Sequence, residues 1–299
     1  MSSVPDVVLN NGVSMPQLGY GVFRVPDDDT ERAVLAALDA GYRSIDTASL
    51  YGNETGVGRA LSASGLARDH FFVTTKVWND DQGYDSTLRA FDASLGRLGL
   101  DHVDLYLIHW PKPSLDRYVE TWRALEKVYA DRRVRAIGVS NFQPDHLQRL
   151  LGETDVVPAV NQIELHPDLQ QEQLRRFHAE HGVVTEAWSP LGQGLALRHP
   201  VVAELAHRHG RTPAQVVLRW HVQLGNVAIP KSTTPSRIRE NIGLFDFALA
   251  DADMAALAAL ESGTRLGPDP DERETRRRPG FSSAGGRWVS PQVTDVEHR

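Results

Sequence analysis

The sequence predicts an α/β fold, and within that class a (β/α)8 TIM barrel that forms a single domain over residues 1–299. Eight short apolar segments alternate with amphipathic helical segments, as in a parallel sheet whose strands are joined by right-handed crossovers. Eight such units close into a barrel. The rival, an open doubly wound sheet, usually carries G-x-G-x-x-G after its first strand. Here GYGVFR (19–24) and GQGLAL (192–197) both lack the third glycine.

The elements of the barrel follow one another along the chain. An N-terminal β-hairpin is expected first, because Asn11-Gly12 between apolar residues suits a type I′ turn. Thr212-Pro213 and Asp85-Ser86 are each expected to open a helix. Strands are expected at 17–21, 42–46, 71–77, 102–109, 134–139, 158–163, 183–188 and 227–230. Helices are expected near 30–40, 53–65, 84–98, 116–131, 144–151, 170–181, 200–209, 212–224 and 251–261.

The C-terminal segment, residues 263–299, differs in composition from the rest of the chain. It is rich in proline, glycine and charged residues, which predicts a loop or tail at the barrel mouth within the same domain. Its arginines at 276–278 could meet an anionic substrate, but a solvated run of charges is the more ordinary interpretation.

The composition excludes several classes of function. The chain has no cysteine, so disulfides, thiolate metal sites and cysteine nucleophiles are excluded, and no metal site is expected. The formal net charge of −7 argues against a nucleic-acid partner. Neither a signal peptide nor an apolar run long enough to span a membrane is visible. We therefore expect a cytoplasmic protein, without membrane partners, that acts as a monomer.

Polar and aromatic residues end seven of the eight predicted strands. Active sites of such barrels lie at the carboxyl ends of the strands, so these residues should converge on one face. Each has an ordinary structural alternative: Asp46 could cap a helix, Lys76 could pair with it, His109 could be a satisfied buried histidine, and Ser140-Asn141 could cap the next helix. The strand-end residues are Asp46, Lys76, Trp78, His109, Trp110, Ser140, Asn141, Gln162, Trp188, Ser189, Lys231 and Ser232.

Three of these positions, together with Tyr51 five residues after Asp46, suggest a chemistry. A tyrosine phenol is a weak acid, with a pKa near ~10, and a nearby ammonium lowers that pKa. A buried lysine keeps its proton only beside a carboxylate. Asp46, Lys76 and Tyr51 supply carboxylate, ammonium and phenol, and His109 adds a neutral donor that could orient a carbonyl oxygen. Such a set can protonate a carbonyl oxygen, and the hydride must then come from a cofactor.

A second candidate site follows the last predicted strand. PKSTTPSRIREN (230–241) places Lys231, Ser232 and Arg237 around the start of a short helix. A helix N-terminus with cations nearby binds phosphate, and arginine adds a planar fork for a phosphate ester. The alternative is an ordinary capped helix with a surface arginine.

Six motifs in order resemble the aldo-keto reductase superfamily, and within it the bacterial 2,5-diketo-gluconate reductase type. They are IDTASLYGNETGVGRAL (45–61), TKVWN (75–79), LYLIHWP (105–111), IGVSNF (137–142), NQIELHP (161–167) and IPKSTTPSRIRENI (229–242). No single motif is specific to this family. The matches run in order from residue 10 to about 270, and the spacing of the six motifs is highly specific.

The resemblance implies a barrel that binds NADPH without a Rossmann domain and reduces aldehydes or ketones. Tyr51 would be the general acid, tuned by Lys76 and Asp46, with His109 orienting the carbonyl. The resemblance also assigns contacts to the cofactor. Ser140, Asn141 and Gln162 would bind the nicotinamide carboxamide, Trp188 would stack on the ring, Ser189 and Leu191 would contact the pyrophosphate, and Lys231, Ser232, Thr234, Arg237, Glu240 and Asn241 would bind the adenosine 2′-phosphate and the adenine.

The substrate pocket is expected beside Tyr51. Val22, Phe23, Trp78 and Trp110 would form an apolar, aromatic wall suited to small carbonyl compounds, although aromatic packing at the rim is the alternative. Asp168 stands where similar proteins often carry tyrosine, which would alter the loop at the barrel mouth. The physiological substrate is not predicted.

Two other functions compete with the reductase. Lys76 at a strand end could form a Schiff base, as in barrel aldolases, but Asp46 and the phosphate motif speak against it. A non-catalytic nucleotide-binding barrel is the second rival. The presence of all four residues of the set, Asp46, Tyr51, Lys76 and His109, favours the reductase.

Overall fold

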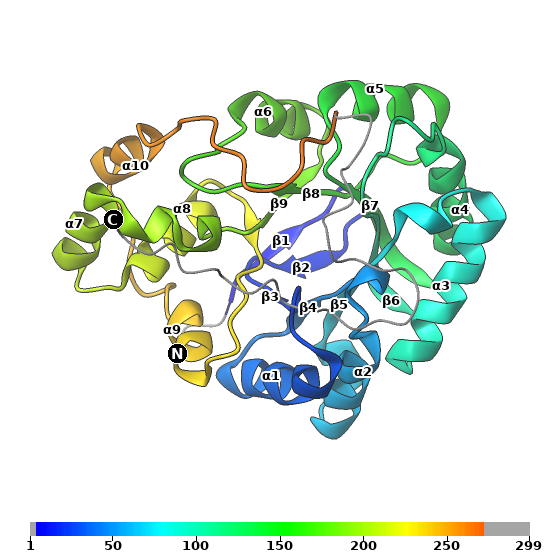
Figure 1. Cartoon of the computed structure of the whole chain (residues 1–299), viewed down its shortest axis with the longest axis horizontal. Helices are drawn as coiled ribbons and strands as arrows, with labels where there is room; N and C mark the ends of the chain where they lie inside the picture. Colours follow the sequence, from blue (N-terminus) through cyan, green and yellow to red (C-terminus); the bar gives the residue numbers. More distant parts are fainter. Residues whose placement is uncertain (1–3, 272–299) are drawn as a thin grey trace, which may run out of the picture.

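The computed structural model describes residues 4–271 of the chain. Eight parallel strands form one sheet in the order β10-β9-β8-β7-β6-β5-β4-β3. A parallel bridge between Leu18 and Ala228 joins the first strand to the last, and the Gly19 amide donates to the Ala228 carbonyl at 2.9 Å. The sheet is therefore closed, and helices surround it (Figure 1). The predicted (β/α)8 barrel is confirmed.

Every predicted strand and helix segment contains an element. The barrel strands are β3 (Tyr20–Gly21), β4 (Ser44–Asp46), β5 (Phe72–Val77), β6 (Val103–Ile108), β7 (Val134–Ser140), β8 (Val160–Glu164), β9 (Val184–Trp188) and β10 (Val227–Ala228). The helices are α1 (Asp27–Ala40), α2 (Glu54–Ala63), α3 (Tyr84–Leu98), α4 (Tyr118–Ala130), α5 (Pro144–Glu153), α6 (Glu172–Glu180), α7 (Pro200–His209), α8 (Pro213–Gln223), α9 (Pro235–Ile242) and α10 (Asp251–Ala258). Short 3-10 turns are η1 (Ser49–Tyr51), η2 (Arg68–His70), η3 (Asn79–Asp81), η4 (Gly192–Gly194) and η5 (Ala196–Arg198).

Two predicted helix starts have different outcomes. Thr212 caps α8 as expected, because its hydroxyl accepts a hydrogen bond from the Gln215 amide and Pro213 is the first helical residue. Helix α3 covers Tyr84–Leu98, as predicted, and Asp85 and Ser86 lie in its first turn, but neither is its N-cap. The N-cap is Gly83, whose φ of 118° glycine adopts easily and other residues adopt only with strain.

The N-terminal hairpin is present, but its predicted turn type is wrong. Strands β1 (Asp6–Val8) and β2 (Ser14–Pro16) pair antiparallel, and the Leu9 amide bonds to the Val13 carbonyl across a three-residue loop. Only Gly12 has a positive φ, 85°, whereas a type I′ turn needs one at both central residues. A three-residue hairpin loop instead combines a type I turn with a following residue in the left-handed conformation, which here is Gly12.

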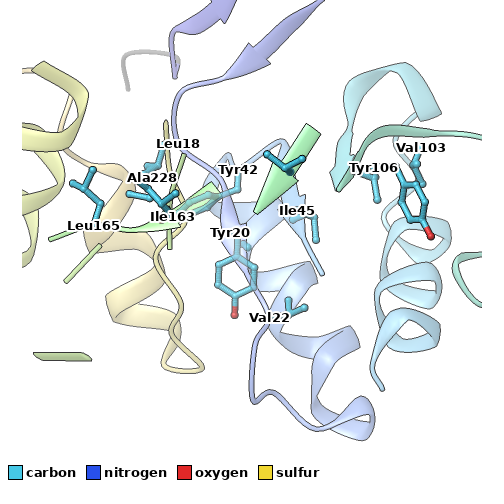
Figure 2. Close-up of a cluster of buried hydrophobic side chains, with 14 of the residues drawn as sticks. Leu18, Tyr20, Val22, Tyr42, Ile45, Val103, Tyr106, Ile163, Leu165 and Ala228 are labelled. Atoms are coloured by element: carbon cyan, nitrogen blue, oxygen red, sulfur yellow. The ribbon is translucent and has the colours of Figure 1, made fainter. Parts of the chain in front are cut away.

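The strands bury side chains on both of their faces. Because successive side chains point to opposite sides of a strand, one set packs outward against the helices, as Figure 2 shows for Tyr20, Ile45, Tyr106 and Ile163. The other set fills the barrel interior. Its apolar members pack with Leu9 and Met15 of the hairpin, which closes the amino end of the barrel; they are Phe72, Leu105, Leu107, Ala136, Val160 and Val227, with Ala159 in the same cluster. Polar inward-facing residues are left to the carboxyl ends.

The described part of the C-terminal segment lies at the barrel mouth, as predicted. After α10 the chain runs past α6 toward α5 (Figure 1), and the backbone amides of Leu266 and Gly267 donate to the Glu164 carboxylate at 2.6 and 2.8 Å. The arginines at 276–278 lie outside the described residues. No helix within residues 4–271 is long and apolar enough to cross a membrane.

Candidate active site

A buried ion pair lies at the carboxyl ends of β4 and β5. The Lys76 ammonium donates to both carboxylate oxygens of Asp46, at 2.8 and 2.9 Å, and to the Thr47 carbonyl at 2.8 Å. Lys76 is 0% exposed and Asp46 2%. Burial on its own lowers the pKa of Lys76. The attraction of the Asp46 carboxylate, joined by those of Tyr51 and Glu186 once these groups ionise at higher pH, outweighs burial and holds that pKa above its usual value. The lysine is therefore a fixed cation.

Tyr51 lies directly against this cation. It ends η1, the turn that follows β4, and the Ser49 hydroxyl ties that turn to β5 by donating to the Lys76 carbonyl at 2.9 Å. The Lys76 ammonium is 5.1 Å from the centre of the Tyr51 ring. The ends of β4, β5 and β6, which carry Asp46 and Tyr51, Lys76, and His109, thus meet at one place.

The predicted net lowering of the Tyr51 pKa is wrong for the protein as it stands. Burial raises the pKa of the phenol to about 12, although the charge and hydrogen bond of Lys76 act to lower it. Loss of solvent is the largest effect, and the Asp46 carboxylate also raises that pKa. The phenol therefore keeps its proton at neutral pH.

Four aromatic side chains form a continuous row across the barrel mouth, which we call the aromatic row. The ring centres of Phe23 and Tyr51 are 5.0 Å apart, those of Tyr51 and His109 5.6 Å, and those of His109 and Trp78 5.2 Å. Burial, and then the Lys76 charge, lower the pKa of His109 well below its usual value, so its imidazole is neutral. Its Nδ1 atom has no hydrogen-bond partner among the described residues.

The other two predicted pocket residues lie differently. Val22 is fully buried in the core between sheet and helices, so it has no surface to offer a substrate, and its predicted role is not supported. Trp110 is 9% exposed, and its carbonyl accepts a hydrogen bond from Gln82 at 2.8 Å. The wall beside Tyr51 is therefore made mainly by Phe23, which is 49% exposed, and Trp78.

A polar rim, made of Ser140, Asn141, Gln162 and Trp188, continues from the aromatic row over β7, β8 and β9. The Trp188 indole donates to Asn141 Oδ1 at 2.8 Å, and Asn141 Nδ2 donates to the His109 carbonyl at 2.9 Å. The Ser140 hydroxyl donates to the Gln162 carbonyl at 2.8 Å. Asn141 holds φ at 65°, a conformation that asparagine tolerates better than most residues. These bonds position the rim before any ligand arrives.

The predicted phosphate-binding residues lie together between β10 and α9. Lys231, Thr234 and Arg237 are exposed, and Pro235 is the first residue of α9, so two cations lie at the N-terminal turn of that helix. The Tyr20 hydroxyl fixes the segment by donating to the Ser232 carbonyl at 2.5 Å. Partial burial and the nearby Arg24 guanidinium lower the pKa of Lys231.

The remaining predicted cofactor residues flank these two groups. Asn241 is buried in α9, and the Glu240 carbonyl accepts from the Gln215 side chain at 3.1 Å. Ser189, with φ at 48°, and Leu191 lie in the loop after β9, where the Gly192 amide donates to the Ser189 carbonyl. Among the described residues, no group of three or more histidine or acidic side chains is arranged to hold a metal ion.

Two carboxylates near the site, Glu186 and Glu164, were not predicted from the sequence, and Asp168 was predicted only to alter the loop at the barrel mouth. Glu186 accepts a hydrogen bond from the Gln162 side chain at 2.8 Å. Glu164 holds the C-terminal loop, and Asp168 bonds to His199 at 2.7 Å while its carbonyl accepts the Ser262 and Thr264 amides. The alternation of side chains along a strand could have found the two glutamates. Glu164 is two residues from Gln162 on β8, and Glu186 is two residues from Trp188 on β9, so each points to the same side of its strand as a predicted site residue.

The class of protein that this barrel and site define is an oxidoreductase acting on carbonyl and alcohol groups. The Aldo/keto reductase family model matches residues 12–262, and the chain belongs to that family. An aldo-keto reductase of Mycolicibacterium smegmatis is 58% identical over 89% of this chain and 97% of its own length. A glyoxal reductase of Bacillus subtilis is 52% identical (91% and 98%), and a morphine 6-dehydrogenase of Pseudomonas putida is 51% identical (91% and 96%).

Solved structures agree with these relatives. An aldo/keto reductase from Brucella melitensis has a TM-score of 0.85 and is 55% identical, covering 87% of this chain and all of its own. A mutant of the protein Gox0644, solved in complex with NADPH, has a TM-score of 0.88 and is 48% identical, covering 91% and 99%.

We predict that Asp46→Asn destabilises the protein by about 3–5 kcal/mol, because it leaves the Lys76 ammonium buried without an anion. Unfolding by urea, followed by circular dichroism, measures the loss. The double variant Asp46→Asn, Lys76→Met removes the stranded charge and should recover most of that stability. A double variant as unstable as Asp46→Asn alone would contradict the ion pair.

Proposed function

We propose that this protein uses NADPH to reduce small aldehydes and ketones to alcohols, with Tyr51 as the proton donor. The observation that carries the proposal is the position of the phenol, between a buried ammonium held charged by Asp46 and the neutral imidazole of His109. This arrangement supports the proposal because it offers one acid, one positive charge and one neutral donor to a carbonyl oxygen bound beside them.

The residues around the mouth have the donors and surfaces that NADPH requires. Lys231, Arg237 and the first turn of α9 offer cations and backbone amides for a phosphate ester. The polar rim offers the Trp188 ring for stacking and the side-chain oxygens of Ser140 and Gln162 for an amide. Both amide hydrogens of Gln162 are already donated to Asp46 and Glu186, so only its carbonyl oxygen is open to a ligand. When bound, the cofactor supplies the hydride.

The chain's own groups handle the proton and the charge. As negative charge develops on the substrate oxygen, the Tyr51 phenol gives up its proton, since an alkoxide is a far stronger base than a phenolate. The Lys76 ammonium stabilises the phenolate that results, and its fixed position means that it need not reorganise during the reaction. The neutral His109 donates a hydrogen bond to the same oxygen and orients the carbonyl.

The class of substrate follows from the aromatic row. Phe23 and Trp78 flank Tyr51 and His109 with apolar surface, which suits small carbonyl compounds. Relatives of nearly equal identity are a glyoxal reductase and a morphine 6-dehydrogenase, so overall identity does not select the substrate. The monomeric state, the absence of nucleic-acid partners and the cytoplasmic location stay predictions.

Schiff-base chemistry at Lys76 is the weaker alternative. A lysine nucleophile must lose its proton, but this ammonium donates three hydrogen bonds and has a raised pKa. A non-catalytic barrel is disfavoured because all four residues of the predicted set are present and converge on one point. Borohydride trapping of substrate on the protein would revive the first alternative.

We predict that Tyr51→Phe lowers kcat for carbonyl reduction by about 10²–10⁴-fold, the usual contribution of a positioned acid. NADPH binding, measured by quenching of tryptophan fluorescence, should stay within about twofold of the wild type, since the phenol is not among the residues proposed to hold the cofactor. Turnover within tenfold of the wild type would rule out Tyr51 as the proton donor.

We predict that Arg237→Gln raises the KM for NADPH by about tenfold or more, since a charge-assisted bond to phosphate contributes about 1.5–3 kcal/mol. The KM for NADH, which lacks the 2′-phosphate, should hardly change. Arg239→Gln, a second exposed arginine on α9, is the matched control and should alter neither value. Equal effects of Arg237→Gln on both cofactors would contradict the phosphate site.

A further inference from the structure

A second buried carboxylate, that of Glu186, lies beside the catalytic ion pair. Glu186 is on β9, two residues before Trp188, and is 0% exposed. The Gln162 side-chain nitrogen donates to Glu186 Oε2 at 2.8 Å and to Asp46 Oδ2 at 2.8 Å, so one amide bridges the two carboxylates. Within residues 4–271, Glu186 Oε1 has no hydrogen-bond partner. This group is not needed for the proton transfer described above.

The local charges decide which form of Glu186 the barrel holds. Two carboxylates and a single ammonium share this part of the interior, and the ammonium's three hydrogen bonds go to Asp46 and Thr47. An ionised Glu186 would be a buried charge without a partner of its own, which is costly. Burial, and then the Asp46 charge, raise the pKa of Glu186 to about 8, against the smaller lowering effects of Gln162 and Lys76. Glu186 therefore carries a proton at neutral pH.

We propose that Glu186 is a positioning residue whose proton, held next to the Gln162 bridge, keeps the positive charge of Lys76 effective at Tyr51. This inference rests on the function proposed above. Protonated, Glu186 leaves the pair of Asp46 and Lys76 without a further charge. Ionised, it adds a negative charge in a medium of low dielectric, and that charge makes the phenol a weaker proton donor.

The neighbours of Glu186 leave few other groups that could cause the same effect. Among residues 4–271, the ionisable groups that act on it or on which it acts are Asp46 on β4, Lys76 on β5 and Tyr51 in η1. From β8 it meets the neutral Gln162, and its register partner on β10 is Val227. If kcat falls as the pH rises through about 8, substitution of Glu186 can therefore show whether its carboxyl group causes the loss.

The test compares the wild type with Glu186→Gln, which has the shape of the protonated acid and cannot ionise. In the wild type, kcat for carbonyl reduction with saturating NADPH should fall as the pH rises through about 8. The kcat of the variant should match that of the wild type within twofold at pH 6.5. Above pH 8 the variant should keep this kcat and exceed the wild type by about threefold for each unit by which ionised Glu186 raises the Tyr51 pKa in the wild type. Glu180→Gln, at an exposed position, is the matched control and should follow the wild type.

A second readout needs no activity. Because the folded protein binds the Glu186 proton more tightly than the unfolded chain, its stability falls as the pH rises from the ordinary glutamate pKa through about 8. The Tm of the ligand-free wild type should therefore drop relative to Glu186→Gln between pH 6 and pH 9. Parallel Tm curves, or parallel kcat profiles despite diverging Tm curves, would each overturn the proposal.

An independent measurement covers the case in which Glu186→Gln does not fold. Infrared difference spectra of the wild type should show a protonated carboxylic acid at pH 6 that disappears with a midpoint near 8. No such band would overturn the proposal. The infrared and Tm measurements use the ligand-free protein and report only the protonation of Glu186. Their failure can therefore be told apart from a failure of the proposed role of Tyr51, which Tyr51→Phe tests.

Discussion

The site depends on one interaction, the bidentate pairing of the Lys76 ammonium with the Asp46 carboxylate inside the barrel. Taking both ions out of water costs several kcal/mol each, and their attraction only offsets this cost when the geometry is close and the remaining protons are bonded. The Thr47 carbonyl completes the set. What the protein obtains is a permanent positive charge with no exposed surface, next to a phenol. The electrostatic interaction of such a charge with a neighbouring group is much stronger in the low dielectric of the barrel interior than in water.

The barrel supplies this charge because of how its strands alternate. The inward-facing side chains are apolar near the amino ends, where the hairpin with Leu9 and Met15 closes the interior, and polar near the carboxyl ends. The apolar interior therefore lies under a buried polar layer of Asp46, Lys76, Gln162 and Glu186. Because no water reaches these side chains from below, they hydrogen-bond to one another. At the ends of β7 and β9, Asn141 and Ser189 hold positive φ angles, a local strain that clusters at functional sites.

Much of the fold could be predicted because hydrophobic period and strand-end polarity are properties of short segments. The set of Asp46, Tyr51, Lys76 and His109 was accessible for the same reason. Other features depend on contacts between distant segments. The hairpin turn type depends on one extra loop residue, and Val22 is buried because its side chain packs in the core between the sheet and the helices. The Tyr51 pKa depends on how much water the neighbouring rings exclude, and Glu186 looks like any strand residue until Gln162 joins it to Asp46.

The central claim is that Lys76 acts on the reaction through Tyr51 and not independently. A double-mutant cycle on kcat tests it most directly, with Lys76→Met, Tyr51→Phe and the combined variant, after each is shown to bind NADPH. If the ammonium works through the phenol, the combined variant should be no slower than the slower single variant, as expected of residues that act as a unit. Losses that multiply in the combined variant would contradict the account.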